Sequence, residues 1–314
     1  MAASIVLLLL AGTSLFVGVS NVTLGSLAQG DGHAFQVLMA SRLPRTLALI
    51  LAGMGMAVAG LILQMLVRNK FVEPSTVGTM DSASLGILVM MLFAPDAPVI
   101  VKMVIAAVFA LAGTALFMRI LSVIPLRSVL MVPVIGIMLS GVIGAVKTFV
   151  AFRFDLLQSI GAWTTGDFSV VLRGRYELLW IIAGLTVVAY VAADRFTVAG
   201  LGQDFTTNLG LNHRRIISLG LAVIALVTAA VVVTVGTIPF LGLIVPNVVS
   251  LMIGDNIRRA LPWVAVMGAG LVLLCDIIGR LIIYPFEIPI GTVMGVIGAI
   301  FFLFLILRRN ARVA

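Results

Sequence analysis

The chain has 314 residues, of which 62% are hydrophobic and only 10% are charged. A soluble domain of this length carries far more polar surface, so the composition excludes one and indicates a polytopic membrane protein. The formal net charge is +8. This excess does not indicate nucleic acid as a partner, because the cations fall mostly in short loops between apolar runs, as the positive-inside bias predicts.

Ten apolar runs follow one another, each bounded by charged residues or by Pro and Gly. Only helices and closed barrels satisfy the backbone in lipid, and runs this long without strict alternation predict helices. We therefore expect an all-α fold, a single transmembrane domain over residues 1–314 with ten transmembrane helices. The predicted spans cover residues 4–20, 46–67, 76–93, 99–122, 129–150, 177–193, 216–235, 240–254, 263–283 and 289–307.

The first run has no basic residue before it and no clear small-residue cleavage site, so we interpret it as a retained span. Ten spans place both termini on one side. Because Arg308, Arg309 and Arg312 follow the last span, that side should be the cytoplasm. The bias is weak, and some of the outward cations are therefore expected to serve a partner. The outward cations on this topology are Arg42, Arg45, Lys102, Lys147, Arg153, Arg173, Arg175 and Arg280.

The second span, 46–67, is rich in small residues and is preceded by two cations. Pairs such as Gly53 and Ala57 are four residues apart and let helix backbones approach closely in lipid. This pattern fits packing inside one bundle as well as the lining of a pathway, and Gln64 slightly favours the pathway. Arg42 and Arg45 share a face, and from the residues alone headgroup anchoring is favoured over a dock for an acidic protein.

Two loops are long enough to fold. In the outer loop, 151–176, the run WTTGDFS with Trp163 predicts a short interfacial helix with an aromatic anchor. In the inner loop, about 194–215, Asp204 or Thr206 could cap a short helix that Gly210 ends. A second short helix would start near Asn212. Such a pair would suit docking into another protein, although a solvated hairpin is slightly favoured for the loop taken alone.

Two features of the C-terminal half place unusual residues at membrane depth. Pro239 and Pro246 interrupt the run from Gly236 to Gly254, which predicts either a mobile gate or a static kink. Asp276 and Arg280 lie four residues apart inside one span. A charge pair there is costly and rarely incidental, although it could simply satisfy itself. Glu287 is a further candidate partner for Arg280.

Several chemical motifs are absent from the sequence. It has no phosphate loop, no His-Glu-x-x-His zinc motif and no Gly-x-Ser-x-Gly elbow, so we expect no catalysis on this chain. Cys275 stands alone, and His33 and His213 fall in different loops, so we expect no metal site, cofactor or intrachain disulfide. Acidic residues in the spans are nearly limited to Asp81 and Asp276, which makes an ion-coupled carrier the weaker alternative.

The motifs of the whole chain, in their order, closely resemble the FecCD family of permeases. They include RLPRTLALILAGMGMAVAG, W…GDFS, LGLNHRR, PFLGLIVPN, D-IIGR and EIPIG. The family comprises the membrane permeases of ATP-binding-cassette importers for iron–siderophores, haem and vitamin B12. The resemblance implies the type II importer permease fold with ten helices. It also implies an assembly of two permeases, two cytoplasmic ATPases and one periplasmic binding protein.

The resemblance also implies roles for individual residues. Arg42, Arg45 and Arg280 match arginines that receive acidic residues of the periplasmic binding protein. The ATPase-coupling set comprises Gln203, Asp204, Thr207, Asn208, Leu209, Gly210, Leu211, Asn212 and Arg214. The set expected along the translocation path or its gate comprises Gly53, Met56, Gly60, Gln64, Pro239, Pro246 and Asn247.

The chain departs from the usual family pattern in a few places. Asn247 stands where His is usual, Ser250 where Arg is frequent, and Lys70-Phe71 where Pro-Leu is common. These departures resemble the branch that serves catechol-type siderophores and pairs with a second, different permease. We therefore expect a non-catalytic subunit of a ferric-siderophore importer in the bacterial inner membrane. Haem or cobalamin is the alternative cargo, and an intramembrane enzyme is a remote third class.

Overall fold

The structure is a computed structural model that describes residues 2–18, 23, 25–26, 29–124, 130–174, 176–254 and 256–310. Within these ranges the chain is helical between short turns. Among the described residues, Thr165 and Thr237 form an isolated parallel β-bridge. The predicted all-α fold is confirmed. Two of the cations named in the topology prediction, Arg175 and Arg312, lie outside the described residues.

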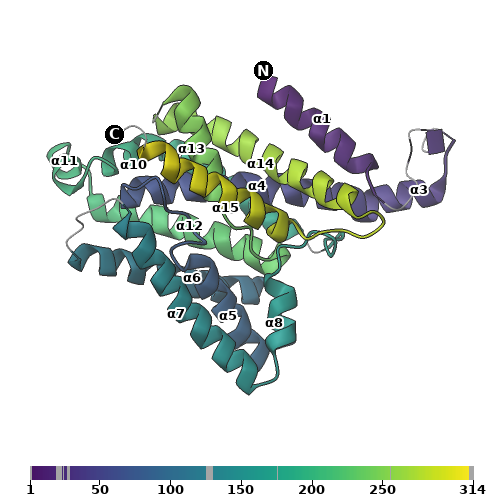
Figure 1. Ribbon diagram of the computed structural model, residues 1–314, viewed down its shortest axis with the longest axis horizontal. Helices are drawn as coiled ribbons and strands as arrows, with labels where there is room; N and C mark the ends of the chain where they lie inside the picture. Colours follow the sequence, from purple (N-terminus) through teal and green to yellow (C-terminus); the bar gives the residue numbers. More distant parts are fainter. Residues whose placement is uncertain are drawn as a thin grey trace.

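The helices follow the predicted runs in chain order (Figure 1). They are α1 (Ala2–Phe16), α3 (Gly32–Val37), the π-helix η1 (Leu38–Arg42), α4 (Leu43–Val67), α5 (Thr79–Phe93), α6 (Val99–Val123), α7 (Met131–Arg153), α8 (Leu157–Thr164), the 3-10 helix η2 (Glu177–Leu179), α9 (Trp180–Val191), α10 (Ala193–Ala199), α11 (Gln203–Asn208), α12 (His213–Val235), α13 (Leu241–Ile253), α14 (Ile257–Ile282) and α15 (Ile290–Asn310).

Each of the ten predicted runs coincides with a helix or a helix pair, but they differ in length. Among the described residues, five helices are long and apolar enough to cross a membrane, or six if a pair bent by 61° between Val191 and Ala193 counts as one span. The remaining apolar helices, α1, α5, α13 and α15, are shorter. The number of ten membrane crossings therefore stays a prediction.

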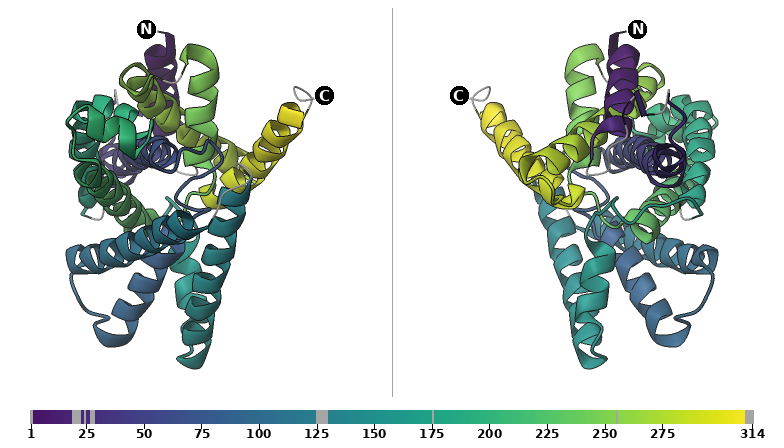
Figure 2. Two further views of the ribbon diagram at one scale, coloured as in Figure 1. Left: turned by 90° about the vertical axis from the view of Figure 1, so that its left-hand side faces the viewer. Right: turned by 90° about the vertical axis from the view of Figure 1, so that its right-hand side faces the viewer.

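The long α4 helix is the centre of the bundle and packs against α14, α12, α13 and α9. Ala48, Ala52 and Met56 are fully buried on it. By contrast, α7 and α15 project from the body in different directions and leave much of their apolar surface uncovered (Figure 2). The core of this chain is thus built around the small-residue span.

Glycines let α4 approach its neighbours closely. A Cβ on Gly53 would lie 2.6 Å from the carbonyl oxygen of Gly268 on α14. A Cβ on Gly242 of α13 would lie 2.9 Å from the Cα of Gly60. These contacts are within one chain, so they favour the packing interpretation of the small residues. A role in lining the passage stays a prediction for Gly53, Met56 and Gly60.

Several predicted helix boundaries were wrong. Arg42 and Arg45, predicted to precede the second span, lie inside a continuous helix, because η1 and α4 continue α3 without a break from Gly32. In the outer loop, the helix ends at Thr164, and residues 166–169 form an irregular segment because Asp167 accepts hydrogen bonds from the backbone and hydroxyl of Ser169. Pro246 lies inside α13, so the choice between a mobile gate and a static kink stays a prediction.

The inner loop also differs from its prediction. The N-cap of α11 is Gly202 with no side-chain cap, so neither Asp204 nor Thr206 caps it. Thr206 instead donates to the Gly202 carbonyl at 2.6 Å. The predicted stop at Gly210 is correct, because its φ of +74° is the left-handed conformation that ends helices. After Asn212 the long α12 begins, where a second short helix was expected.

A Cβ at Gly60 should destabilise the protein, because it would overlap the main chain of Gly242. We expect Gly60→Ala to lower the free energy of unfolding by about 1–3 kcal/mol, measured by thermal unfolding in detergent. The matched control is Gly184→Ala on α9, where an added Cβ meets nothing within 4 Å. Equal stability of the two variants would contradict the packing interpretation.

Candidate functional site

The chain turns sharply between α12 and α13, at residues 236–240. Gly236 has a φ of +87° and Phe240 a φ of +63°, so two residues of this turn are left-handed. Thr237 donates its backbone N–H to the Thr164 carbonyl at 3.1 Å. Gly166 accepts from Gly291 at 2.9 Å. The outer loop thus links this turn to the start of α15, which is distant from it in sequence.

A remote carboxylate holds the start of α13. Glu73, in the loop between α4 and α5, is fully buried. Its Oε1 accepts from the backbone N–H of Phe240 at 2.6 Å, and its Oε2 accepts from that of Gly242 at 3.0 Å. The first N–H groups of a helix lack internal partners, and a carboxylate satisfies them while complementing the helix dipole. Glu73 was not among the predicted site residues, although a lone acid between two apolar spans was the available signal.

Gln64 compensates for the proline inside α13. Pro246 has no N–H, so it cannot donate to the carbonyl four residues earlier, at Gly242. The Nε2 of Gln64 donates to that oxygen at 3.0 Å. Asn247 adds another link, because its Nδ2 donates to the Leu243 carbonyl at 2.7 Å and to the Lys70 carbonyl at 2.8 Å. The buried amides predicted for the gate therefore fasten α13 to α4 and its following loop.

A cluster of arginines and carboxylates lies at the other end of α4. Arg45 donates through Nε at 3.1 Å and Nη2 at 2.6 Å to Oδ1 of Asp276 on α14. Its Nη1 donates to Oε2 of Glu287 at 2.7 Å. Glu287 had been considered as a partner of Arg280, but the structure pairs it with Arg45. Arg280 instead pairs with Asp276 on its own helix.

Two of the arginines predicted to dock a partner hold α1 in this chain. Nη1 of Arg280 donates to the carbonyls of Ser14 at 3.1 Å and Val17 at 2.8 Å, and its Nη2 donates to the Ser14 hydroxyl at 2.8 Å. Arg42 also donates to the Val17 carbonyl. Arg42 and Arg280 are 8% and 2% exposed. The structure therefore brings all three arginines together but buries two of them against the end of α1.

The other acid predicted inside a span is paired as well. Asp81 on α5 accepts from the Lys147 ammonium of α7 at 2.8 Å and from the Ser140 hydroxyl. Both predicted intramembrane acids, Asp81 and Asp276, are thus neutralised by cations within the chain. An ion-coupled carrier would need an unpaired carboxylate at its coupling site. Neither Asp81 nor Asp276 is unpaired in this arrangement.

The predicted coupling set gathers at the end of the bundle opposite the arginine cluster, around α11 (Figure 1). Most of its side chains are exposed, including Leu209 at 57%. Phe205, on the same short helix, is 54% exposed but was not predicted. An apolar residue inside a polar loop was the signal that could have identified it. The Arg258–Asp194 pair, at 2.5 Å, lies nearby between α14 and α10.

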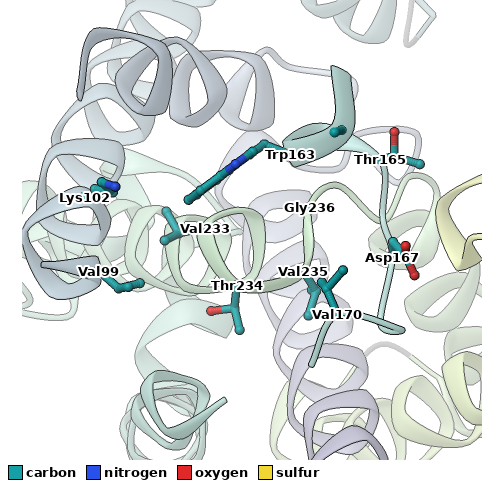
Figure 3. Close-up of a pocket in the computed structure, with 11 residues that line it drawn as sticks. Val99, Lys102, Trp163, Thr165, Asp167, Val170, Val233, Thr234, Val235 and Gly236 are labelled. Carbon is teal, nitrogen blue, oxygen red and sulfur yellow. The ribbon is translucent and has the colours of Figure 1, made fainter. Parts of the chain in front are cut away.

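Two cavities flank these elements. One, of about 450 Å³, is lined by Lys102 of α6, Trp163 of α8 and Thr234 of α12. Figure 3 shows the Trp163 ring extending toward α12, and the Lys102 Nζ lies 5.6 Å from its centroid. Trp163 was predicted as an interfacial anchor, whereas the contact with Lys102 was not foreseen. The other, of about 300 Å³, lies between α4, α10 and α13, and Arg68 is among the residues that line it.

Gln64→Met should leave the Gly242 carbonyl without a donor while keeping the side-chain volume similar. We expect a loss of about 1–3 kcal/mol in the free energy of unfolding, measured by thermal or chemical unfolding in detergent. Pro246→Ala is the matched second change, because it restores an N–H for the same oxygen. The double variant should recover most of the lost stability. Additive losses would show that the two residues do not serve the same carbonyl.

The chain was compared with families and with known proteins. The model of the FecCD transport family matches residues 1–308. The chain is 47% identical over 307 residues to the petrobactin import system permease protein YclN of Bacillus subtilis, covering 98% of this chain and 97% of YclN. It is 40% identical over 299 residues to the ferric-anguibactin transport system permease protein FatD of Vibrio anguillarum, covering 95% of both chains.

A solved structure supports the same relationship. It is described as an inward-facing conformation of an ABC transporter of the metal-chelate type, with a TM-score of 0.82, 25% sequence identity and 98% coverage of both chains. The likeness extends over the whole bundle, and the predicted type II importer permease fold is confirmed. The family match, the relatives and this fold agree, and the chain belongs to the FecCD transport family.

Proposed function

We propose that the chain is a membrane-spanning permease subunit of an ATP-driven ferric-siderophore importer, and that its cargo is of the catecholate type. The observation that carries the proposal is the near full-length similarity to permeases named for petrobactin and ferric-anguibactin import. Haem or cobalamin as the cargo is the alternative. The chain itself would hydrolyse no ATP and bind no cofactor.

The proposal includes the partners that such an importer needs. These are a second permease, favoured to be a different chain, two cytoplasmic ATPases and a periplasmic siderophore-binding protein. The uncovered faces of α7 and α15 offer apolar surface to a second permease or to lipid. Phe205 and Leu209 offer exposed apolar side chains at the opposite end from the arginines. We place the α11 end and both termini in the cytoplasm of a bacterial inner-membrane protein.

We further propose that the turn at residues 236–240 and the proline-containing α13 act in the gate. This segment has left-handed residues and a proline inside its helix. Its position depends on a few hydrogen bonds, which Glu73 and the Thr164 carbonyl accept and Gln64 donates. Movement of α11 could reach it through α10, which packs against α4 and α14. Pro239, Pro246 and Asn247 would then contribute by shaping the segment.

Reconstituted transport tests the proposed function. The chain is assembled in proteoliposomes with a second permease, the ATPase and the binding protein, and uptake of ferric petrobactin is measured with and without ATP. We expect uptake to require ATP and every partner. Excess haem or cobalamin should not compete with it. Uptake by this chain alone would point to a secondary carrier, and competition by haem or cobalamin would favour the alternative cargo.

Substitution of the exposed apolar residues of α11 should uncouple the ATPase. We expect Leu209→Glu to reduce transport about tenfold or more, since the variant would bury an unpaired charge in the interface. ATP hydrolysis should continue but lose its stimulation by the binding protein. The control is Ser122→Glu at the end of α6, which adds the same charge outside the coupling loop. Equal transport by both variants would argue against docking at α11.

A further inference from the structure

Arg45 is shared by two carboxylates that differ in how firmly they are held. The side chain of Asp276 is 0% exposed and lies on α14, where it also pairs with Arg280. The side chain of Glu287 is 27% exposed and lies in the turn between α14 and α15. Of the three guanidinium nitrogens, Nε and Nη2 are bonded to Asp276, while Nη1 is bonded to Glu287. The bond to Glu287, the outer pair, thus uses a different nitrogen from the two bonds to the buried Asp276.

The outer pair can separate without leaving a buried charge unpaired. When Glu287 moves away, Arg45 keeps Asp276, and Glu287 itself already reaches solvent. Partly exposed ion pairs contribute little to stability, whereas breaking a fully buried pair is costly. The Asp276–Arg280 pair belongs to the second kind, because both side chains are at most 2% exposed. Glu287, the partner of Arg45 Nη1, is therefore the group of this cluster that an external group can replace most easily.

We propose that Glu287 is an internal competitor, which occupies Nη1 of Arg45 until a carboxylate on the docking surface of the binding protein displaces it. This inference rests on the proposed function and deepens it. It explains how an arginine with a side chain only 11% exposed can receive an external acid. It also separates the roles of the three arginines, because Arg42 and Arg280 remain bonded to the end of α1.

The kind of partner follows from the chemistry of the exchange. A group that replaces Glu287 must be an anion able to accept a hydrogen bond from a guanidinium, and a carboxylate of Asp or Glu fits that geometry. The partner must also reach into the rim beside the α14–α15 turn, so its acid has to stand on a protruding element. Affinity is then set by the difference between two carboxylates and not by one ion pair alone.

The test measures the affinity of the binding protein for the complete importer in nanodiscs. We expect Glu287→Gln to tighten binding about two- to fivefold, because the internal competitor loses its charge while its amide can still bond Arg45. In the Arg45→Ala background binding should be weaker overall, and Glu287→Gln should bring no gain. Arg45→Ala is expected to fold, because Asp276 keeps Arg280 as its partner.

A control separates local competition from general electrostatics. Asp31→Asn removes the same charge near the start of α3, and asparagine preserves the cap that Asp31 provides to His33 and Ala34. Its affinity should match that of the unaltered importer. Three results would overturn the proposed competition. Glu287→Gln could leave the affinity unchanged, Asp31→Asn could give an equal gain, or Glu287→Gln could give the same gain in the Arg45→Ala background. If the unaltered importer does not bind the protein at all, the proposed function itself fails.

Discussion

A helix that breaks inside a membrane protein must find partners for its free backbone groups within the protein, because lipid offers none. At the start of α13 this constraint is met by side chains from elsewhere in the chain. Glu73 accepts from two backbone N–H groups, and Gln64 donates to the carbonyl that Pro246 leaves free. The close contact of Gly60 with Gly242 brings α4 near enough for these bonds. The packing of the bundle and the position of the proposed gate therefore depend on the same few residues.

The two ends of the bundle use charge differently. Around Arg45 and Asp276, cations and carboxylates are buried and bind one another, so their removal affects the fold as well as any partner. Around α11, charged and apolar side chains are exposed, and Arg258 and Asp194 pair at the surface with side chains 60% and 64% exposed. Surface pairs of this kind contribute little to stability. A partner at the α11 end can thus bind without first breaking the internal contacts of the chain.

The sequence allowed a good prediction of the helices and the family, because long apolar runs and their order leave few alternatives. It predicted less well how polar residues pair. Arg45 and Glu287 are separated by 242 residues, and no local pattern indicates that contact. The prediction of a helix cap at Asp204 or Thr206 was wrong for a different reason. Gly202 occupies the N-cap position, and the Thr206 hydroxyl donates back to its carbonyl. Glu73 could have been singled out as an isolated acid, but its partners on α13 depend on the tertiary packing.

The hydrogen bonds from Arg280 to Ser14 join residues that are 266 positions apart. They can form only after almost the entire chain has been synthesised and inserted. Until then Arg42 is the arginine that can hold the end of α1, and Arg280 is paired with Asp276 on its own helix. The packing of α1 against α14 can follow only after α14 has been synthesised, which makes it a late step of biogenesis.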